Sequence, residues 1–542
     1  MRCTRNIIIP SRRLFQPTPG PDTLGRAGVA ARAMAARAMA AALLALAFMS
    51  ASAAAGAVAS SLDMAMVCSP DLKLNPLTCV ERDPQSIMGL VYEPLISLDD
   101  NRAPQPMLAE SWVEIGSGIW EFTLREGVMF HNGKEMTSRD VVATLNAINE
   151  LAADGQGMYI QTARTLSDWE AKSEYVVRVK ARQPGYMTLY AMAFPILSEG
   201  ETLPDCPPGT GPFQIDFYQP GSQLLLVANQ RWWQRATSIR SVTAHWYGTD
   251  ADALTAFQLE QVDALMTRSL QATRYKGVVG SAVTSLDYAT RQLEVVLYNN
   301  SASILKQAET RQALSLAIDR GRLAQIIYQN MVSLTDSIAM PRSNLYNSDM
   351  RSIAYNPEAA NRMLDALGYS SRNENGFRAD AEGNELTLRL FYYDEQGSSL
   401  RHDAAFQIKD MLAQVGVNAK ITYYLFDNGK AKLASGDFDL FLCAINFGVV
   451  PDPTFMLSTS SDSNYARYRG KDIGELLKSL TRAPDEAAFR EAWYSVQAMM
   501  ANDMPLLPLY WRNGILLTRG VYLNARNLRE YEVLRSLAES NR

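Results

Sequence analysis

Residues 386–426 read LTLRLFYYDEQGSSLRHDAAFQIKDMLAQVGVNAKITYYLF, a pattern of strand, helix and second strand. Alternating apolar residues predict a strand near Leu386–Tyr392. The helix after it is predicted from apolar residues at helical spacing, namely Ile408, Met411, Leu412 and Val415. Gly416 ends this helix, and alternation resumes at Val417, Ala419, Ile421 and Tyr423. The second half of the chain is therefore predicted to contain an α/β lobe.

Residues 440–455, LFLCAINFGVVPDPTF, predict another strand, followed by a loop in which Pro451 and Pro453 restrict the backbone. In open α/β sheets the ligand lies beyond the carboxyl ends of the strands. The loops that follow Tyr392 and Cys443 are therefore candidate parts of one binding site.

Other elements are predicted from equally local signals. Thr137 and Asp140 form a capping-box pattern at the start of a helix. Another helix is predicted from the N-cap Asn356, through Pro357 at the first helical position, to Leu367. Half-exposed strands are predicted where apolar and polar residues alternate, around 120–125 and 177–180.

Length and charge limit the class of protein. The chain has 542 residues, beyond the roughly 250 to 300 at which a single core stops growing, so two or more cores are expected. The net charge is −5 and no basic tract is present, which argues against a partner of DNA or RNA.

The N-terminal region has the pattern of a secretory signal peptide. The Arg-containing stretch RAGVAARAMAARAM is followed by the apolar stretch AAALLALAFMSASAAAGAVA. Cleavage is expected after Ala59, with Ala55 as the alternative, so residues 1–59 are the predicted signal peptide. An uncleaved membrane anchor over 38–59 is the competing interpretation. The translation start is left open between Met1, Met34 and Met39.

Four cysteines follow the predicted signal peptide and would lie in an oxidising compartment. A bridge between Cys68 and Cys79 is the expected pair because the two are close in sequence, and it would contribute about 3 kcal/mol. Pairing of Cys206 with Cys443 and two buried free thiols are both left open.

The sequence lacks the common catalytic and cofactor patterns. His131, His245 and His402 are far apart and lack metal-ligand spacing. No G-x-S-x-G elbow, P-loop or G-x-G-x-x-G cradle occurs between a predicted strand and helix. The chain is therefore not expected to be an enzyme or to hold a metal or cofactor.

Several stretches together resemble the periplasmic solute-binding proteins of the peptide- and nickel-type family of ATP-binding-cassette importers. The first is YEPLISLDDNRAPQPMLAESWVEIGSGIWEFTLREGVMFHNGKEMTSRDVV, residues 92–142. The others follow in the family's order: GTGPFQIDFYQPGSQLLLVANQRWW, TRQALSLAIDRGRLAQIIYQ, YNPEAANRMLDALGY, GDFDLFLCAINFGVVPDPTF and MPLLPLYW. The resemblance covers nearly the whole of the expected mature chain.

This resemblance implies a two-lobed α/β binding-protein fold with an extra subdomain in the first lobe. The implied parts are a first lobe over 60–297 with a subdomain at about 99–198, a second lobe over 298–504, and a return to the first lobe over 505–542. Two hinge crossings are implied, near 296–300 and 506–509.

The implied function is capture of a small molecule or short peptide by lobe closure in the periplasm, followed by delivery to a membrane permease. The protein is expected to be a monomer. A secreted sensor or scaffold with the same fold is the alternative.

The resemblance also bears on specificity. Peptide-binding members hold the peptide's amino terminus with an Asp in a W-x-x-D-x-x-D-P loop. Asp452 and Pro453 match its last two positions, which places Asn446 at the Trp position and Val449 at the Asp position. Glu395 falls at or next to the position of the Arg that binds the substrate carboxylate in dipeptide binders. A free dipeptide is therefore disfavoured, because its charged ends would be buried without partners.

A cationic or hydroxyl-rich ligand could use Asp394, Glu395 and Asn446 as acceptors and Phe447 as a packing surface. The competing interpretation is that the two acids are solvated loop residues and that the alignment is shifted by one position. Loop position adds Ser69 and Arg401 as weaker candidates. The predicted ligand-binding residues are Asn446, Phe447, Val449, Asp452, Asp394, Glu395, Arg401 and Ser69.

Overall fold

The computed structural model describes residues 61–234, 237–278, 282–350, 352–394, 398–520 and 528–535. The predicted signal peptide, both of its cleavage sites and the three candidate start positions lie outside these ranges. Within them, no helix combines the length and the apolar character needed to cross a membrane.

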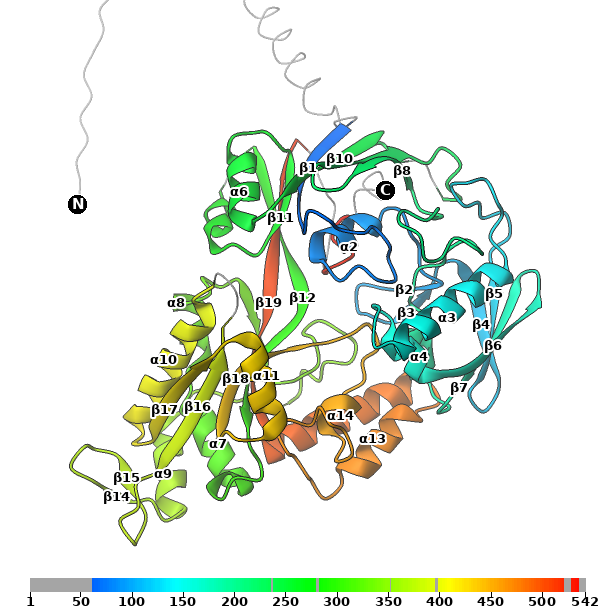
Figure 1. The fold of residues 1–542 in the computed structure, drawn as a ribbon. Helices are drawn as coiled ribbons and strands as arrows, with labels where there is room; N and C mark the ends of the chain where they lie inside the picture. Colours follow the sequence, from blue (N-terminus) through cyan, green and yellow to red (C-terminus); the bar gives the residue numbers. More distant parts are fainter. Residues whose placement is uncertain are drawn as a thin grey trace, which may run out of the picture. The chain divides into compact units, whose positions relative to one another are not determined.

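A mixed sheet of eleven strands forms the centre of the fold (Figure 1). The strands are β1 (Ser61–Val67), β8 (Phe213–Gln219), β9 (Gln223–Ala228), β10 (Ser241–Tyr247), β11 (Ala264–Thr267), β12 (Val283–Tyr298), β13 (Val332–Leu334), β16 (Thr387–Tyr393), β17 (Asn418–Tyr424), β18 (Leu440–Asn446) and β19 (Leu506–Arg519). Their order is β17-β16-β18-β12-β19-β11-β1-β10-β9-β8, and β13 pairs with β19. The long antiparallel strands β12 and β19 thus join β16–β18 on one side to β1 and β8–β11 on the other.

The strand–helix–strand unit predicted from residues 386–426 is confirmed. Strands β16 and β17 pair in parallel, from Thr387 opposite Asn418 to Tyr393 opposite Tyr424. The helix between them, α10 (Leu400–Gln414), packs on both strands and buries Ile408 completely. The α/β class follows from this unit and from the parallel pairing of β1 with β10 and β11.

A second sheet, of four strands in the order β4-β5-β7-β6, lies in the first half of the chain. Its strands are β4 (Ala109–Gly116), β5 (Ile119–Leu124), β6 (Leu166–Ser173) and β7 (Val176–Ala181), and the neighbouring helices are α3 (Ser138–Ala153), α4 (Ile160–Thr165) and α5 (Met187–Ala191). The predicted capping box is confirmed, because the Asp140 carboxylate accepts a hydrogen bond from the Thr137 backbone N–H at 2.7 Å.

The remaining elements are short strands and helices around the two sheets. The strands are β2 (Ile96–Leu98), β3 (Pro104–Pro106), β14 (Ser371–Arg372) and β15 (Arg378–Ala379). The helices are α2 (Arg82–Met88), α6 (Asp250–Gln258), η1 (Leu270–Tyr275), η2 (Ile304–Lys306), α7 (Ala308–Leu316), α8 (Arg320–Ile326), α9 (Pro357–Ala366), α11 (Phe426–Ser435), α12 (Thr454–Leu457), α13 (Ile473–Thr481) and α14 (Glu486–Asp503). Asn356 caps α9 as predicted, since its side chain accepts from the Ala359 N–H at 2.9 Å.

The buried apolar residues form separate clusters. The largest gathers residues between 62 and 288 with residues 516–534 from the chain's end. Two further clusters draw mainly on residues 293–511. Each of these groups includes residues of β12 or β19, so the two long strands contribute to all of them. The expected lobe limits at 297/298 and 504/505 stay a prediction.

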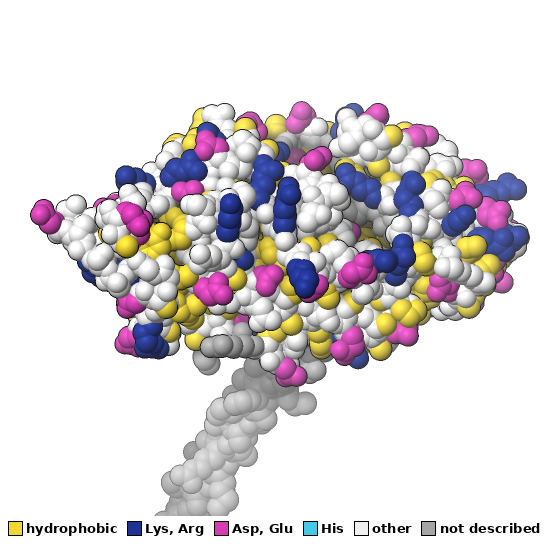
Figure 2. All heavy atoms as spheres, turned by 90° about the horizontal axis from the view of Figure 1, so that it is seen from below, with side chains coloured by type: hydrophobic (Ala, Val, Ile, Leu, Met, Phe, Trp, Pro, Cys, Tyr) yellow, Lys and Arg dark blue, Asp and Glu magenta, His cyan; other side chains and the backbone are white. Residues whose placement is uncertain are grey.

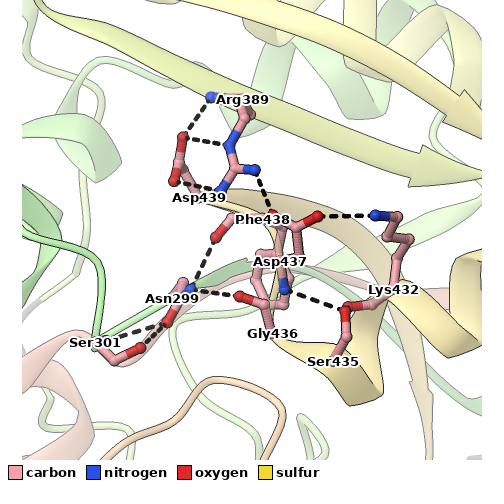
Figure 3. A network of polar contacts seen from close by, with 9 residues as sticks. All are labelled: Asn299, Ser301, Arg389, Lys432, Ser435, Gly436, Asp437, Phe438 and Asp439. Carbon is pink, nitrogen blue, oxygen red and sulfur yellow. Dashed lines mark hydrogen bonds and ion pairs between the residues drawn. The ribbon is translucent and has the colours of Figure 1, made fainter.

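Two asparagines anchor the end of β12, and Figure 3 shows the contacts of the first, Asn299. The Asn299 side-chain amide donates to the carbonyl oxygens of Gly436 and Phe438, at 2.9 and 2.8 Å. The Asn300 amide donates to the carbonyl oxygen of Pro505, just before β19, at 3.1 Å. These bonds fix the exit of β12 against the start of β18 and the start of β19.

The same region is held by an ion-pair network on the turn before β18 (Figure 3). The Arg389 guanidinium lies 2.6 Å from an Asp437 carboxylate oxygen and 3.2 Å from one of Asp439. Arg389 belongs to β16, so the network ties β16 to the turn that Asn299 also contacts.

The expected disulfide between Cys68 and Cys79 is wrong in this structure, where the four described cysteines are free thiols. Closeness in sequence does not set the direction of the two Cβ–S bonds, and the Cys79 sulfur faces the Glu81 carbonyl oxygen at 4.0 Å. Burial raises the pKa of Cys68 to about 12 and that of Cys79 to about 11. Cys206 and Cys443 pack with different apolar clusters, so they do not pair either.

Candidate ligand-binding site

One cavity is lined by segments from both halves of the chain and is termed the main cavity for that reason. Its volume is about 620 Å³, within the usual range of small-molecule sites. Residues 76–98, 158–195 and 530–535 line one part of it, and the loop after β18, residues 446–449, lines another. Arg291 and Gln292 of β12 line it as well. A solute in this cavity would therefore touch segments from both halves of the chain.

Two smaller cavities adjoin the main one. The first, of about 40 Å³, shares Arg291 and Phe447 with the main cavity. The second, of about 320 Å³, shares Arg102 and Trp511 with the first. Together they form one region, which extends from the main cavity past Arg291 to Arg102.

Three of the predicted site residues, Asn446, Phe447 and Val449, line the main cavity. β18 ends at Asn446, and the next backbone N–H, of Phe447, donates to the Arg291 carbonyl oxygen at 2.9 Å. The Phe447 ring packs on Trp511 with ring centroids 5.3 Å apart. The loop is thus held against β12 and β19 at the wall of the cavity.

Three other predicted residues are placed differently. The Asp452 carboxylate accepts from the backbone N–H and hydroxyl of Thr454, at 2.9 and 2.8 Å, so it caps α12. Ser69 is exposed, and neither it nor Asp394 is among the residues that line the described cavities. Glu395 lies outside the described residues.

Arg401, the last predicted site residue, is 2% exposed and belongs to a buried ion triad. Its guanidinium lies 2.9 Å from the Glu294 carboxylate, which is also 2.8 Å from Arg512. Burial alone would raise the pKa of Glu294, but the charges and hydrogen bonds of Arg401 and Arg512 hold this pKa below its usual range. Arg401 therefore compensates a buried carboxylate and does not line the cavity.

The charged residues that do line the main cavity were missed from sequence. They are four arginines and two glutamates, namely Arg82, Arg268, Arg291, Arg535, Glu530 and Glu532. The cavity is thus richer in basic than in acidic groups, whereas Figure 2 shows the two signs interspersed over an outer face. One sequence signal pointed to Arg291: the apolar alternation of β12 breaks between Ala289 and Leu293, where the structure has a register shift. Such irregularities often re-aim a side chain beside a site.

The two glutamates of this cavity are already engaged. Glu530 forms an ion pair with Arg268 and accepts from the Arg291 backbone N–H at 3.2 Å. Glu532 forms an ion pair with Arg529 at 3.7 Å. The Arg291 guanidinium instead lies over the Tyr531 ring, 4.6 Å from its centroid. Both carboxylates of the cavity are therefore paired, and its four arginines outnumber them.

Beside the cavity, residues 183–190 contact the ends of α13 and α14. The Tyr186 backbone N–H donates to the Ala483 carbonyl oxygen at 2.7 Å. The rings of Tyr190 and Phe489 lie 5.7 Å apart. A Cβ added to Gly185 would lie 2.4 Å from the Thr481 carbonyl oxygen, so the two segments are in close contact.

Among the described residues, no group of three or more His, Cys, Asp or Glu side chains is arranged to hold a metal ion. The chemistry of the site is that of hydrogen bonding, charge and apolar contact.

Comparison with known proteins identifies the kind of protein to which this site belongs. Residues 103–467 match the family model described as bacterial extracellular solute-binding proteins, family 5 Middle. The chain is 24% identical over 466 residues to the oligopeptide-binding protein AppA of Bacillus subtilis, covering 81% of this chain and 84% of AppA. It is 20% identical over 437 residues to the nickel-binding periplasmic protein of Escherichia coli, covering 74% and 81% of the two chains.

A solved structure shares the fold. NikA from Brucella suis, in complex with Fe(III)-EDTA, superposes with a TM-score of 0.75 at 18% identity, over 88% of this chain and 98% of NikA. The two-lobed binding-protein fold expected from the sequence is therefore confirmed.

Proposed function

The chain belongs to family 5 of the bacterial extracellular solute-binding proteins of ATP-binding-cassette importers, and from this premise we propose that it captures a solute in the periplasm by lobe closure and delivers it to a permease. The observation that carries the proposal is the main cavity, which is lined by segments from both halves of the chain.

The cavity gives closure a physical reason. A solute that contacts residues 76–98 and 446–449 at once gains all its contacts only when the two sides are close, so binding shifts the equilibrium toward the closed state. We place the two lobes at 60–297 with 505–542, and at 298–504, with β12 and β19 as the crossings. Asn446, Phe447 and Val449 are the proposed contacts from the second lobe.

A free dipeptide is a poor candidate for the solute. Val449 lines the cavity at the position where the resemblance places the amine-binding Asp of peptide binders, and an isopropyl group offers no acceptor. A buried ammonium group without a partner costs several kcal/mol, enough to remove useful affinity. The corresponding role of Glu395 stays a prediction.

The relatives are binding proteins by name, and the proposed role here is likewise binding without turnover. The solute would be released unchanged.

The test is to purify the mature chain from the periplasm of its own host, denature it and identify the released small molecules by mass spectrometry. One solute per chain is expected, and returning it to the stripped protein should reduce the radius of gyration in small-angle scattering. A stripped protein that binds its released solute without becoming more compact would contradict closure. Release of a chemically altered product would contradict binding without turnover.

A further inference from the structure

Arg102 lies where the two smaller cavities meet, since it lines both of them. Among the described residues, the hydrogen bond of its guanidinium goes to the Met340 sulfur at 3.8 Å, and a thioether is a weak acceptor. Burial and the charges of Arg291 and Arg529 lower the pKa of Arg102 to about 10. A positive charge is thus held beside two others, with a weak acceptor as its partner.

Arg291 lines the same small cavity as Arg102. The part of the structure that is described contains no carboxylate in ion-pair contact with its guanidinium, which rests on the Tyr531 ring. Cation–π contact leaves the edge N–H groups of a guanidinium available to an incoming acceptor. Arg291 therefore offers a charged, two-pronged donor at the passage between the cavities.

Arg529 completes the group at the far cavity and is 8% exposed. Its Nη2 donates to the Asp99 carbonyl oxygen, but its Nη1 has no hydrogen-bond acceptor within the described ranges. The ion pair of Nη1 with Glu532 is long, at 3.7 Å. The indole N–H groups of Trp493 and Trp511, residues that also line these cavities, equally lack acceptors among the described groups. Buried donors without acceptors are costly, and an acceptor-bearing solute would remove that cost.

We propose that the solute is an anion, a compound bearing carboxylate or phosphate groups, and that Arg102, Arg291 and Arg529 bind its anionic group at the junction of the cavities. Guanidinium groups bind both anions through paired, charge-assisted hydrogen bonds. This inference rests on the proposed capture function and assigns the substrate class. It also reverses the sign of charge expected from Asp394 and Glu395. Asp394 does not line these cavities, and the two glutamates of the main cavity are in ion pairs. In the far cavity Asp287 pairs with Lys276, and Asp100 is outnumbered by three arginines, Arg102, Arg342 and Arg529.

The test measures binding to the stripped, full mature chain by calorimetry at constant ionic strength. The probes are citrate for carboxylates, glucose 6-phosphate for phosphates, dialanine for zwitterions and spermidine for cations. At least one of the two anions is expected to bind, while dialanine and spermidine do not. The anion that binds distinguishes the two sources of negative charge.

Two variants test the assignment of residues. Arg102→Gln and Arg291→Gln should each weaken anion binding by roughly 10- to 100-fold, the effect of losing a charge-assisted hydrogen bond. Arg178→Gln is the matched control, because Arg178 pairs with Glu121 in the four-stranded sheet and lines none of the cavities described here. Without an anion, Arg102→Gln should be at least as stable as the native chain, since it removes the repulsion between Arg102 and the charges of Arg291 and Arg529. If Arg102 had a purely structural role, the same substitution would lower the free energy of unfolding.

Several results would overturn the proposal: failure of both anions to bind, binding of spermidine or dialanine in their place, or anion affinity unchanged in both variants. The radius of gyration from small-angle scattering distinguishes a wrong anion assignment from a wrong capture function. If a neutral or cationic solute released from the protein compacts it, capture by closure stands and the anion assignment falls. If the released solute does not compact it, the capture function itself falls.

Discussion

Replacing Glu294 by glutamine is expected to destabilise the protein more than any loss of a surface ion pair. Glu294 is 0% exposed and is bound by Arg401 at 2.9 Å and by Arg512 at 2.8 Å. The substitution removes the carboxylate charge that both buried guanidinium groups contact. Breaking a buried pair in this way costs about 3–5 kcal/mol.

The measurement is the free energy of unfolding from urea denaturation, followed by circular dichroism. Glu121→Gln is the matched control, since it removes a carboxylate 2.7 Å from Arg178 at a half-exposed position. That loss should cost less than about 1 kcal/mol, as for other exposed pairs.

A triple variant, Glu294→Leu with Arg401→Met and Arg512→Met, separates lost pairing from lost packing. Replacing a whole buried ion group by apolar residues of similar volume is often neutral or stabilising, so this variant should recover most of the stability lost by Glu294→Gln. The reasoning is refuted if Glu294→Gln is no more destabilising than Glu121→Gln.

Four further outcomes are expected. The pKa of Glu294 is lower in the folded than in the unfolded protein, so its contribution to stability is present above the unfolded value of 4.5 and is lost as the pH falls through the folded pKa. The urea midpoints of the native chain and of Glu294→Gln should therefore converge as the pH falls through that range. Midpoints that keep a constant difference at every pH would contradict this. Gly185→Ala sets a Cβ 2.4 Å from the Thr481 carbonyl oxygen, and Gly185 and Thr481 belong to different proposed lobes. The substitution should therefore hinder closure and weaken solute binding in calorimetry, while Gly474→Ala, with open space around it, should not. Asn299→Ala should lower the unfolding free energy by about 1–3 kcal/mol, by leaving two carbonyl groups without their donor. The four described cysteines should all react with a thiol reagent in denaturant without reductant, and a lower count would indicate a disulfide.

The parts of the fold that were predictable are those encoded by neighbouring residues. The spacing of apolar residues predicts the unit β16–α10–β17. The starts of α3 and α9 are predicted from capping side chains that bind a backbone N–H three residues away. The two-lobed fold required the family resemblance, because no local pattern shows that β12 and β19 pair along their length.

The site was predictable where a strand end alone decides the position. The loop after β18 reached the cavity as expected, which placed Asn446, Phe447 and Val449 there. Arg102 and Arg291 were missed because only tertiary structure brings distant parts of the chain together. Sequence spacing could not reveal the buried role of Arg401 either, since its partner Glu294 lies 107 positions away.

The hydrogen bond from Asn300 to Pro505 has a consequence for engineering. It joins the first and last residues of the segment 300–505, which contains β13 to β18 and helices α7 to α14. The two chain connections between this segment and the rest of the protein therefore lie side by side. Chain segments whose ends are adjacent tolerate permutation and transplantation. Residues 300–505 are thus suited to exchange as one unit. The part of the molecule that carries Asn446 and Phe447 could be swapped between relatives through two splice points, which the pairing of β12 with β19 and the Asn300 side chain hold together.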